Sequence, residues 1–431
     1  MKAGLISLGC AKNLVDSETV LGLLRKNGFE IVNNQKEADL IFINTCGFIQ
    51  SAKEEAISTI FETLKSKRDN QKVIVIGCFV ERYKETLIQE IPEVAGWISI
   101  SEYQDFAKIL SKIVGTPCPI NEFDIMNRVV STPSYWAYVR IADGCDNHCA
   151  YCAIPLIRGK YKSRKISEIK KEVEGLVKKG CKEIVLIAQD TTRFGLDTGE
   201  RIEDLLEDVA TIPNLYLLRL LYLYPNDVSD ELIQVIKKHP NIAPYFDLPM
   251  QHGSNSQLKL MNRRGTKEQC LELLTKIRKG IPNAICRTTV MVGFNQESEQ
   301  DFTELLDFIK AAHFDRLGLF KFSKEEGTPS YTMSGEITDT KLVAKRYEQV
   351  IALQRKIAYQ QSKQQIGKEM EAMIIGYNPT NQTYSARSYA FAPDDVDGCI
   401  YIHSDKKYPN GTIVKVRITN CMIYDLEGQI I

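Results

Sequence analysis

The stretch DGCDNHCAYCAIP, from Asp143 to Pro155, holds three cysteines in the spacing C-x3-C-x2-C. Cys145, Cys149 and Cys152 are close enough in sequence to sit on one loop and to bind three irons of a cubane [4Fe–4S] cluster. The fourth iron then has no protein ligand, and an open position of this kind is where a metal centre binds its substrate. The motif therefore predicts an iron–sulfur centre with one iron left open for chemistry.

A zinc knuckle is the alternative interpretation of this loop. Zinc usually takes a fourth ligand, and His148 lies within the motif, but it directly precedes Cys149, which makes the geometry awkward. The alternating strands and helices that follow favour the open cluster. Its free iron can bind S-adenosylmethionine (SAM) through amino and carboxylate groups. Electron transfer into the sulfonium would then cleave a carbon–sulfur bond and release an alkyl radical.

The region after the loop alternates strands and helices, which predicts a full or partial α/β barrel. Six apolar runs are expected to be strands: Trp136–Ala142, Glu183–Ala188, Leu215–Leu223, Ala243–Leu248, Ile285–Val292 and Arg316–Lys321. Helical apolar spacing separates them at Ser167–Lys179, Ile202–Thr211, Asp230–Lys238, Lys267–Arg278 and Glu299–Ala311. One long polar helix, Ile337–Gln365, follows the last unit.

The region before the loop also alternates. Short apolar runs at Lys2–Gly9, Asp39–Thr45, Lys72–Gly77 and Trp97–Ile100 predict strands, and Ser17–Lys26 and Ala52–Lys65 have helical spacing. Strand–helix–strand alternation predicts a parallel sheet with right-handed crossovers. The proline-containing stretch Gly115–Pro133 is a plausible boundary between this sheet and the barrel.

A second set of cysteines belongs to this first region. Cys10, Cys46 and Cys78 each follow an apolar strand, at intervals close to the length of one βαβ unit. In a parallel sheet such residues share the carboxyl edge, where open α/β sheets bind ligands. The three thiols could hold a second cluster there. Three buried cysteines that happen to end strands are the alternative, and the spacing alone does not separate the two.

From Gly367 onward the pattern changes to short strands with glycine and proline turns. Glu371–Tyr377, Gly398–His403 and Thr412–Thr419 predict a small closed β-barrel. The module has six basic and eight acidic residues, so it is mildly acidic; Asp395 is one of the acidic residues.

Composition limits the remaining possibilities. The chain has 431 residues, with 55 basic and 55 acidic side chains, so no global field favours nucleic acid or membrane. No apolar run is long enough for a transmembrane helix, and the short run that ends at Cys10 is below the length of a signal peptide. We expect a cytoplasmic enzyme with no membrane partner. Its twelve cysteines then stay reduced, and the six without motif spacing are expected to be buried small side chains.

Four motifs together resemble the radical-SAM methylthiotransferases. They are SLGCAKNLVDSE (Ser7–Glu18), NTCGFIQSAKEE (Asn44–Glu55), GCFVERY (Gly77–Tyr83) and DGCDNHCAYCAIPLIRG (Asp143–Gly159). The resemblance covers essentially the whole chain. It implies a flavodoxin-like N-terminal domain at 1–115, a radical-SAM partial (β/α) barrel at 131–366 and a C-terminal TRAM barrel at 367–431.

The same resemblance implies two [4Fe–4S] clusters. Cys145, Cys149 and Cys152 would bind the radical-generating cluster, and Cys10, Cys46 and Cys78 an auxiliary cluster that handles the inserted sulfur. SAM would act both as methyl donor and as radical source. An electron donor and a sulfur donor are required partners that the sequence does not identify.

The family has two branches with different substrates. One modifies an adenosine of transfer RNA, and the other modifies the β-carbon of an aspartate in the twelfth small-subunit ribosomal protein. GCAKN at Gly9–Asn13, LYLYP at Leu221–Pro225 and PMQHGS at Pro249–Ser254 are similar to the ribosomal-protein branch. The acidic terminal barrel fits a basic ribosomal protein better than RNA. A rival from another class is a non-catalytic iron–sulfur or zinc protein that binds the ribosome.

Five further residues are candidates for cofactor binding. Gln189, Asp190, Gln251 and His252 end predicted barrel strands, where they are expected to contact SAM or substrate. A structural hydrogen bond is the alternative for each. Arg158 follows the cluster loop and could bind the SAM carboxylate or an acidic substrate, unless it belongs to a solvated run of charges.

Overall fold

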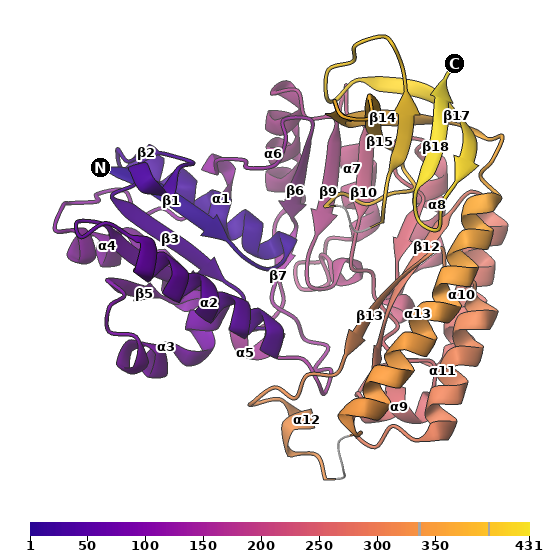
Figure 1. Ribbon diagram of the computed structural model, residues 1–431, viewed down its shortest axis with the longest axis horizontal. Coiled ribbons are helices and arrows are strands. Elements are labelled where there is room, and N and C mark those ends of the chain that lie inside the picture. The colour runs from indigo at the N-terminus through magenta and orange to yellow at the C-terminus, as the bar shows by residue number, and fades with distance from the viewer. Residues whose placement is uncertain (335–337, 395–396) are drawn as a thin grey trace.

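The computed structural model describes residues 1–334, 338–394 and 397–431. Figure 1 shows three parts in chain order: an indigo and purple α/β sheet, a magenta to orange partial barrel, and a small yellow β-barrel at the C-terminus. None of the helices in the described residues combines the length and the apolar character needed to cross a membrane.

The first part is a parallel sheet in the flavodoxin-like order β2-β1-β3-β4-β5. Its strands are β1 (Lys2–Ser7), β2 (Glu30–Ile31), β3 (Leu40–Thr45), β4 (Lys72–Gly77) and β5 (Gly96–Ile98), and its helices are α1 (Ala11–Lys26), α2 (Gln50–Ser66), α3 (Cys78–Glu90) and α4 (Phe106–Val114). Alternate strand residues point to opposite faces. Phe42 and Ile74 therefore pack under α1 and α4, and Ile43 and Val75 under α2 and α3. The edge strand β2 was not predicted, because two residues carry no apolar run.

The second part contains all six predicted barrel strands, paired in parallel. They are β6 (Trp136–Arg140), β9 (Glu183–Ile187), β10 (Leu217–Leu220), β11 (Tyr245–Asp247), β12 (Ile285–Val292) and β13 (Arg316–Lys321). They form the sheets β10-β9-β6 and β11-β12-β13, and a bridge between Leu218 and Ile242 extends the first towards β11. Among the described residues β6 and β13 do not pair with each other, so the barrel is partial.

Helices cover the outside of this barrel. They are α6 (Ile166–Lys178), α7 (Ile202–Ala210), α8 (Asp230–Lys238), α9 (Asn255–Leu260), α10 (Lys267–Gly280), α11 (Glu299–Ala312), α12 (Pro329–Thr332) and α13 (Thr340–Lys363). Ser298 begins α11 with a capping box, in which its hydroxyl and the Asp301 carboxylate satisfy free backbone N–H groups. The predicted long polar helix is α13. Ile337, its expected first residue, lies outside the described residues.

The third part is a closed barrel of five strands in the order β14-β15-β16-β18-β17. The strands are β14 (Glu369–Asn378), β15 (Thr383–Arg387), β16 (Ile400–His403), β17 (Ile413–Cys421) and β18 (Leu426–Ile430). In Figure 1 this barrel covers the end of the partial barrel at which β6, β9 and β10 begin. Strands β15 and β18 were not predicted, because each is short and mostly polar.

The segment after β15 enters the partial barrel rather than facing solvent. Phe391 is fully buried and belongs to one apolar cluster with Tyr138 and Tyr245 of the barrel strands. The Tyr245 hydroxyl donates to buried Asp397 at 2.5 Å. Asp397 thus points inward, and the basic Arg387 is buried as well, so one charge of each sign is removed from the surface of this module. Asp395 lies outside the described residues.

One buried carboxylate joins the terminal barrel to the partial barrel. Glu183, at the start of β9, accepts from Arg219 Nε at 3.0 Å and from Arg387 of β15. Arg219 also donates to the backbone oxygen of Tyr389 at 2.8 Å. Burial opposes ionisation of Glu183, but the Arg387 and Arg219 guanidiniums outweigh it, so the pKa of this carboxyl lies below its usual value.

We expect Glu183→Gln to lower the free energy of unfolding by about 3–5 kcal/mol, because two buried guanidiniums lose their anionic partner. Urea unfolding followed by circular dichroism measures the loss. Since the folded pKa of Glu183 is lowered, its contribution is complete above the unfolded pKa of about 4.3 and disappears as the pH falls through the folded value.

Glu207→Gln is the matched control, since Glu207 pairs with Lys238 and His239 on an exposed surface. Its unfolding should be nearly unchanged. Equal losses in the two variants would contradict the joining role of Glu183.

Candidate active site

The loop with Cys145, Cys149 and Cys152 lies beyond the carboxyl end of β6. It is enclosed by a short antiparallel hairpin of β7 (Ala142–Asp143) and β8 (Lys162–Ser163), and helix α5 (Ile154–Arg158) follows the last cysteine. Gly144 has φ +74°, and a Cβ atom there would lie 2.1 Å from the Lys160 carbonyl oxygen, so only glycine fits this turn. The loop is therefore held in a fixed shape with its three thiols free.

The surroundings of these thiols differ from those of a zinc site. His148 is exposed and does not line the cavity that the three cysteines share. In the described residues, no three His, Cys, Asp or Glu side chains are arranged to hold a single ion. A cubane instead needs its thiolates further apart, because each binds a different iron. His148 therefore does not supply, from this loop, the fourth ligand that a zinc site usually takes.

A half-buried arginine lies beside this trio. Arg263 Nη1 is 3.6 Å from Cys149 Sγ, and the guanidinium stacks 4.1 Å from the centre of the Tyr224 ring. Burial raises the pKa of Cys145, and burial together with nearby Cys149 raises the pKa of Cys152 to about 12. A fixed cation at this position favours the thiolate form that iron requires.

A cavity of about 450 Å³ opens at the carboxyl ends of the barrel strands, where barrel enzymes place their active sites. Six residues expected at functional positions line it: Cys145, Cys149, Cys152, Gln189, Asp190 and Gln251. Gln251 and the neighbouring lining residue Tyr222 have φ of 77° and 65°, a left-handed conformation that non-glycine residues rarely adopt. Such strain is typical of functional sites held by the surrounding fold.

Asp190 is oriented by its neighbours in this cavity. Its carboxylate accepts from Asn147 Nδ2 at 2.6 Å and from the backbone N–H of Thr192 at 3.1 Å. Burial raises its pKa, although these hydrogen bonds act against the shift. The side chain is positioned to accept a hydrogen bond from a ligand in the cavity.

The structure places His252 away from the cavity. Its ring is fully buried, with Nε2 3.0 Å from Glu297 Oε1 and Nδ1 accepting from the Ser254 N–H at 3.0 Å. Glu297 also pairs with Arg346 at 2.9 Å. His252 was considered either as a contact for SAM or substrate or as a structural hydrogen-bonding residue. Its contacts in the structure are those of a structural residue.

The second trio lies at the carboxyl edge of the first sheet, as the strand spacing predicts. Cys10 precedes α1, Cys46 follows β3, and Cys78 begins α3 directly after β4. The loops are packed closely, since a Cβ atom on Gly9 would lie 2.8 Å from Cys46 Cβ. Burial raises the pKa of Cys78 to about 12, with Arg158 acting against the shift and Cys10 and Cys46 adding to it. The three thiols therefore share one electrostatic environment.

Arg158 lies beside Cys78 of the second trio and is not among the residues that line the 450 Å³ cavity. Its Nη2 is 3.5 Å from Cys78 Sγ and 2.6 Å from Asp16, and its Nη1 is 3.3 Å from Asp143. Asp143 directly precedes the loop of the first trio, so one guanidinium connects both cysteine sites. The sequence analysis considered Arg158 as a ligand for the SAM carboxylate or an acidic substrate. In the structure its guanidinium pairs with the buried Asp16 carboxylate instead.

Residues next to the second trio also line the 450 Å³ cavity. Lys12 follows Cys10 by two positions, and Phe48 and Ile49 follow Cys46. The cavity is thus lined by the first trio and by close neighbours in sequence of the second trio. Figure 1 shows α5 and β7 between the first sheet and the barrel. The sequence analysis did not assign Lys12, Phe48, Ile49 or Tyr222 to the site. Their closeness to the cysteines in sequence was the available signal.

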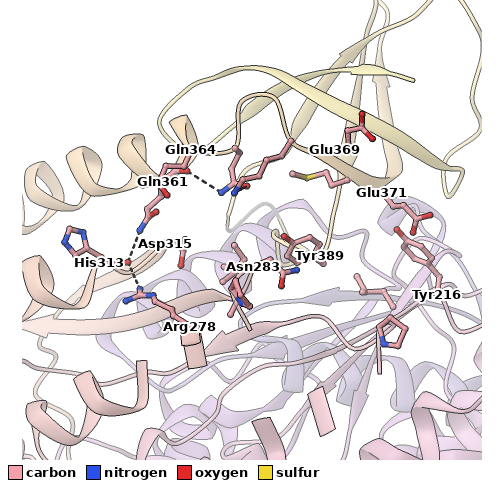
Figure 2. A pocket seen from close by; sticks show the side chains of 18 residues that line it. Tyr216, Arg278, Asn283, His313, Asp315, Gln361, Gln364, Glu369, Glu371 and Tyr389 are labelled. Atoms are coloured by element: carbon pink, nitrogen blue, oxygen red, sulfur yellow. Dashed lines mark hydrogen bonds between the residues drawn. The ribbon is translucent and has the colours of Figure 1, made fainter. Parts of the chain in front are cut away.

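A second cavity of about 830 Å³ lies at the opposite end of the partial barrel. Figure 2 shows it between the terminal barrel, represented by Glu369 and Glu371, and the end of α13, represented by Gln361 and by Gln364, which directly follows the helix. Gln361 and Arg278 both donate to the His313 carbonyl oxygen there. None of the six motif cysteines is among its described lining residues, and it is at the amino ends of the strands, so it is not the site of the predicted chemistry.

The three parts match three family models. Residues 2–99 match an uncharacterized protein family, UPF0004, residues 139–309 match the radical SAM superfamily, and residues 366–431 match the TRAM domain. Among solved structures, the radical SAM methyltransferase TsrM from Kitasatospora setae aligns with a TM-score of 0.57 at 14% identity, over 76% of each chain. The cobalamin-dependent radical enzyme OxsB aligns with a TM-score of 0.51 at 14% identity, over 82% of this chain and 56% of that one.

The cysteine loop at the mouth of a partial barrel, together with these matches, places the chain among the radical-SAM enzymes. Ribosomal protein uS12 methylthiotransferase RimO from Caldicellulosiruptor saccharolyticus is 44% identical over the full length of both chains. The RimO proteins of Clostridioides difficile and Desulforamulus reducens are 43% and 45% identical over at least 99% of each chain. The chain belongs to the RimO family of radical-SAM methylthiotransferases.

We expect His252→Ala to lower the free energy of unfolding by about 1–3 kcal/mol, because one buried oxygen of Glu297 loses its partner. Gln251→Ala, one position earlier but in the cavity wall, should change stability by no more than about 0.5 kcal/mol. Thermal and urea unfolding of both variants make the comparison. If His252→Ala weakened SAM binding at unchanged stability, the structural role would be wrong.

Proposed function

We propose that this enzyme adds a methylthio group to the β-carbon of an aspartate in ribosomal protein uS12, using two [4Fe–4S] clusters and SAM. The observation that carries the proposal is that the first cysteine trio lines one cavity together with Lys12, Phe48 and Ile49, which are neighbours in sequence of the second trio. Family membership supports the reaction type and the protein substrate.

The radical-generating cluster would be held by Cys145, Cys149 and Cys152. Their rigid loop, the neighbouring Arg263 cation and the exposed position of His148 suit a cluster with three protein ligands and one open iron. When bound, the cluster and SAM supply one-electron cleavage of a carbon–sulfur bond. Gln189, Asp190 and Gln251 would orient SAM in the cavity, and the enclosing walls would keep the radical away from water.

The auxiliary cluster would be held by Cys10, Cys46 and Cys78. Arg158 and Asn13 lie beside Cys78, with Asn13 Oδ1 3.6 Å from its sulfur, so the chain supplies polar groups that can tune a bound cluster. The Asn13 side chain also donates to the Leu8 carbonyl oxygen at 2.7 Å, which fixes the loop before Cys10. This arrangement would hold the inserted sulfur on the side of the cavity opposite the first trio.

A radical mechanism suits the substrate chemistry. The β-carbon of an aspartate side chain is an unactivated CH2 group with no proton that an ordinary base could remove. Transfer of a hydrogen atom to the SAM-derived alkyl radical would avoid this barrier. Cys10, Cys46 and Cys78 would hold the cluster that supplies the sulfur for the new carbon–sulfur bond and takes up the remaining electron. No general acid–base pair is needed for that step.

We assign residues 1–115 to the domain of the auxiliary cluster, 131–366 to the radical-SAM core and 367–431 to the TRAM domain. An enzyme that acts on a ribosomal protein would work in the cytoplasm, where ribosomes are assembled. A reductant and a sulfur donor complete the set of partners. The alternative is that the enzyme modifies transfer RNA. Mass analysis of uS12 and of transfer RNA, from cells with and without the gene, distinguishes the two substrates.

Anaerobic preparations of the wild-type protein should be brown and contain about eight irons per chain. Cys145→Ala and Cys78→Ala should each retain about four irons and form no methylthiolated uS12 peptide with SAM and reductant, because each variant loses one cluster site. Iron analysis and mass spectrometry of the peptide are the measurements.

Cys421→Ala in the terminal barrel is the control and should keep full iron content and activity. A colourless protein that contains only zinc would contradict the assignment of both clusters. Product formation by Cys78→Ala would contradict the trapping role of the second trio.

A further inference from the structure

Lys12 is a buried cation that the roles assigned so far do not use. It lies in the first turn of α1, two residues after Cys10, and only 6% of its surface is exposed. Its side chain crosses from the first sheet to the partial barrel, where Nζ is 3.5 Å from the centre of the Tyr222 ring. It lines the 450 Å³ cavity between the two trios.

The carboxylates that line the cavity already have other partners. Asp190 is bound by Asn147 and Thr192. Asp247 accepts from Arg287 at 2.6 Å and from the Tyr222 N–H at 2.9 Å. Within the described parts of the chain, Lys12 has an aromatic ring as its contact and no ion pair. A buried ammonium without a counter-charge is costly, so the cavity is suited to a guest that brings an anion.

Lys12 and Arg263 lie near different cysteine trios. Arg263 lies against Cys149 of the first trio, whereas Lys12 and the Tyr222 ring lie within electrostatic range of Cys10 in the second trio. Of the cations that line the cavity, half-buried Arg263 thus lies beside the first trio and buried Lys12 lies near the second. A carboxylate on SAM would be close to the first, which leaves the second for another carboxylate.

We infer that Lys12 binds the side-chain carboxylate of the target aspartate and so acts as a specificity-determining residue. This inference rests on the proposed function. In aspartate the reacting β-carbon is bonded directly to the carboxylate carbon, at about 1.5 Å. Anchoring the carboxylate at Lys12 therefore fixes the β-carbon beside the second trio. Glutamate would place its carboxylate one CH2 too far from that carbon, and asparagine would lack the charge.

The test compares peptides of the uS12 target sequence that carry Asp, Asn or Glu at the modified position. Binding to the anaerobic two-cluster enzyme is measured by fluorescence anisotropy, which does not depend on turnover. The Asp peptide should bind about 10- to 100-fold more tightly than the Asn peptide. In Lys12→Met this difference should vanish, and Lys12→Arg should restore part of it.

Lys321→Met is the matched control, because Lys321 lines the same cavity but is exposed. It should leave the discrimination unchanged. SAM binding, and SAM cleavage without peptide, should be the same in Lys12→Met as in the wild type. Iron content and circular dichroism verify that the variants are folded, and the Asp–Asn comparison on the wild-type enzyme needs no variant.

Two results would overturn the inference. Equal binding of Asp and Asn peptides by the wild-type enzyme would exclude recognition of the charge. Weaker SAM binding by Lys12→Met, with Asp–Asn discrimination intact, would assign Lys12 to the SAM carboxylate instead. Failure of the proposed function is a different outcome, in which the wild-type enzyme modifies transfer RNA and leaves the uS12 peptide unmodified.

Discussion

The buried Asp16 carboxylate on α1 is the contact on which the arrangement of the active site depends. It pairs with Arg140 at the end of β6 and with Arg158 at the end of α5, both from the partial barrel. Two residues further along α1, Glu18 pairs with Arg128 and accepts from the Ser131 hydroxyl at 2.9 Å. Since α1 begins directly after Cys10, these pairs fix the second cysteine trio relative to the barrel. Loss of one partner would leave a buried charge uncompensated, which opposes any slip between the two parts.

This contact explains why one cavity has access to both kinds of chemistry. The first sheet alone provides three thiols at an open edge, and the partial barrel alone provides three thiols at its mouth. The partial barrel is open between β6 and β13, and α1 packs against β6 near that opening. Lys12, Phe48 and Ile49 thereby become part of the wall that faces Gln189 and Gln251.

The terminal barrel packs against the partial barrel at the end opposite the active-site cavity. The segment after β15 fills the interior of the partial barrel from its amino end, and Asp397 lies 3.9 Å from Arg287 Nε. Arg287 in turn binds Asp247 at the base of the cavity. The TRAM domain thus contributes to the core of the partial barrel. The Glu183 pair with Arg219 and Arg387 holds it in place.

The sequence by itself determined the local features. Apolar periodicity gave the parallel sheet and the six barrel strands, and the rule that parallel strands share a carboxyl edge brought Cys10, Cys46 and Cys78 together. Only the tertiary structure decided which polar side chains face the cavity. Arg158 meets Asp16 across 142 positions (158 − 16), and His252 meets Glu297 across 45. Partners of buried charges are selected by packing between distant segments, which no local pattern encodes, and the same packing brings Lys12 into the cavity.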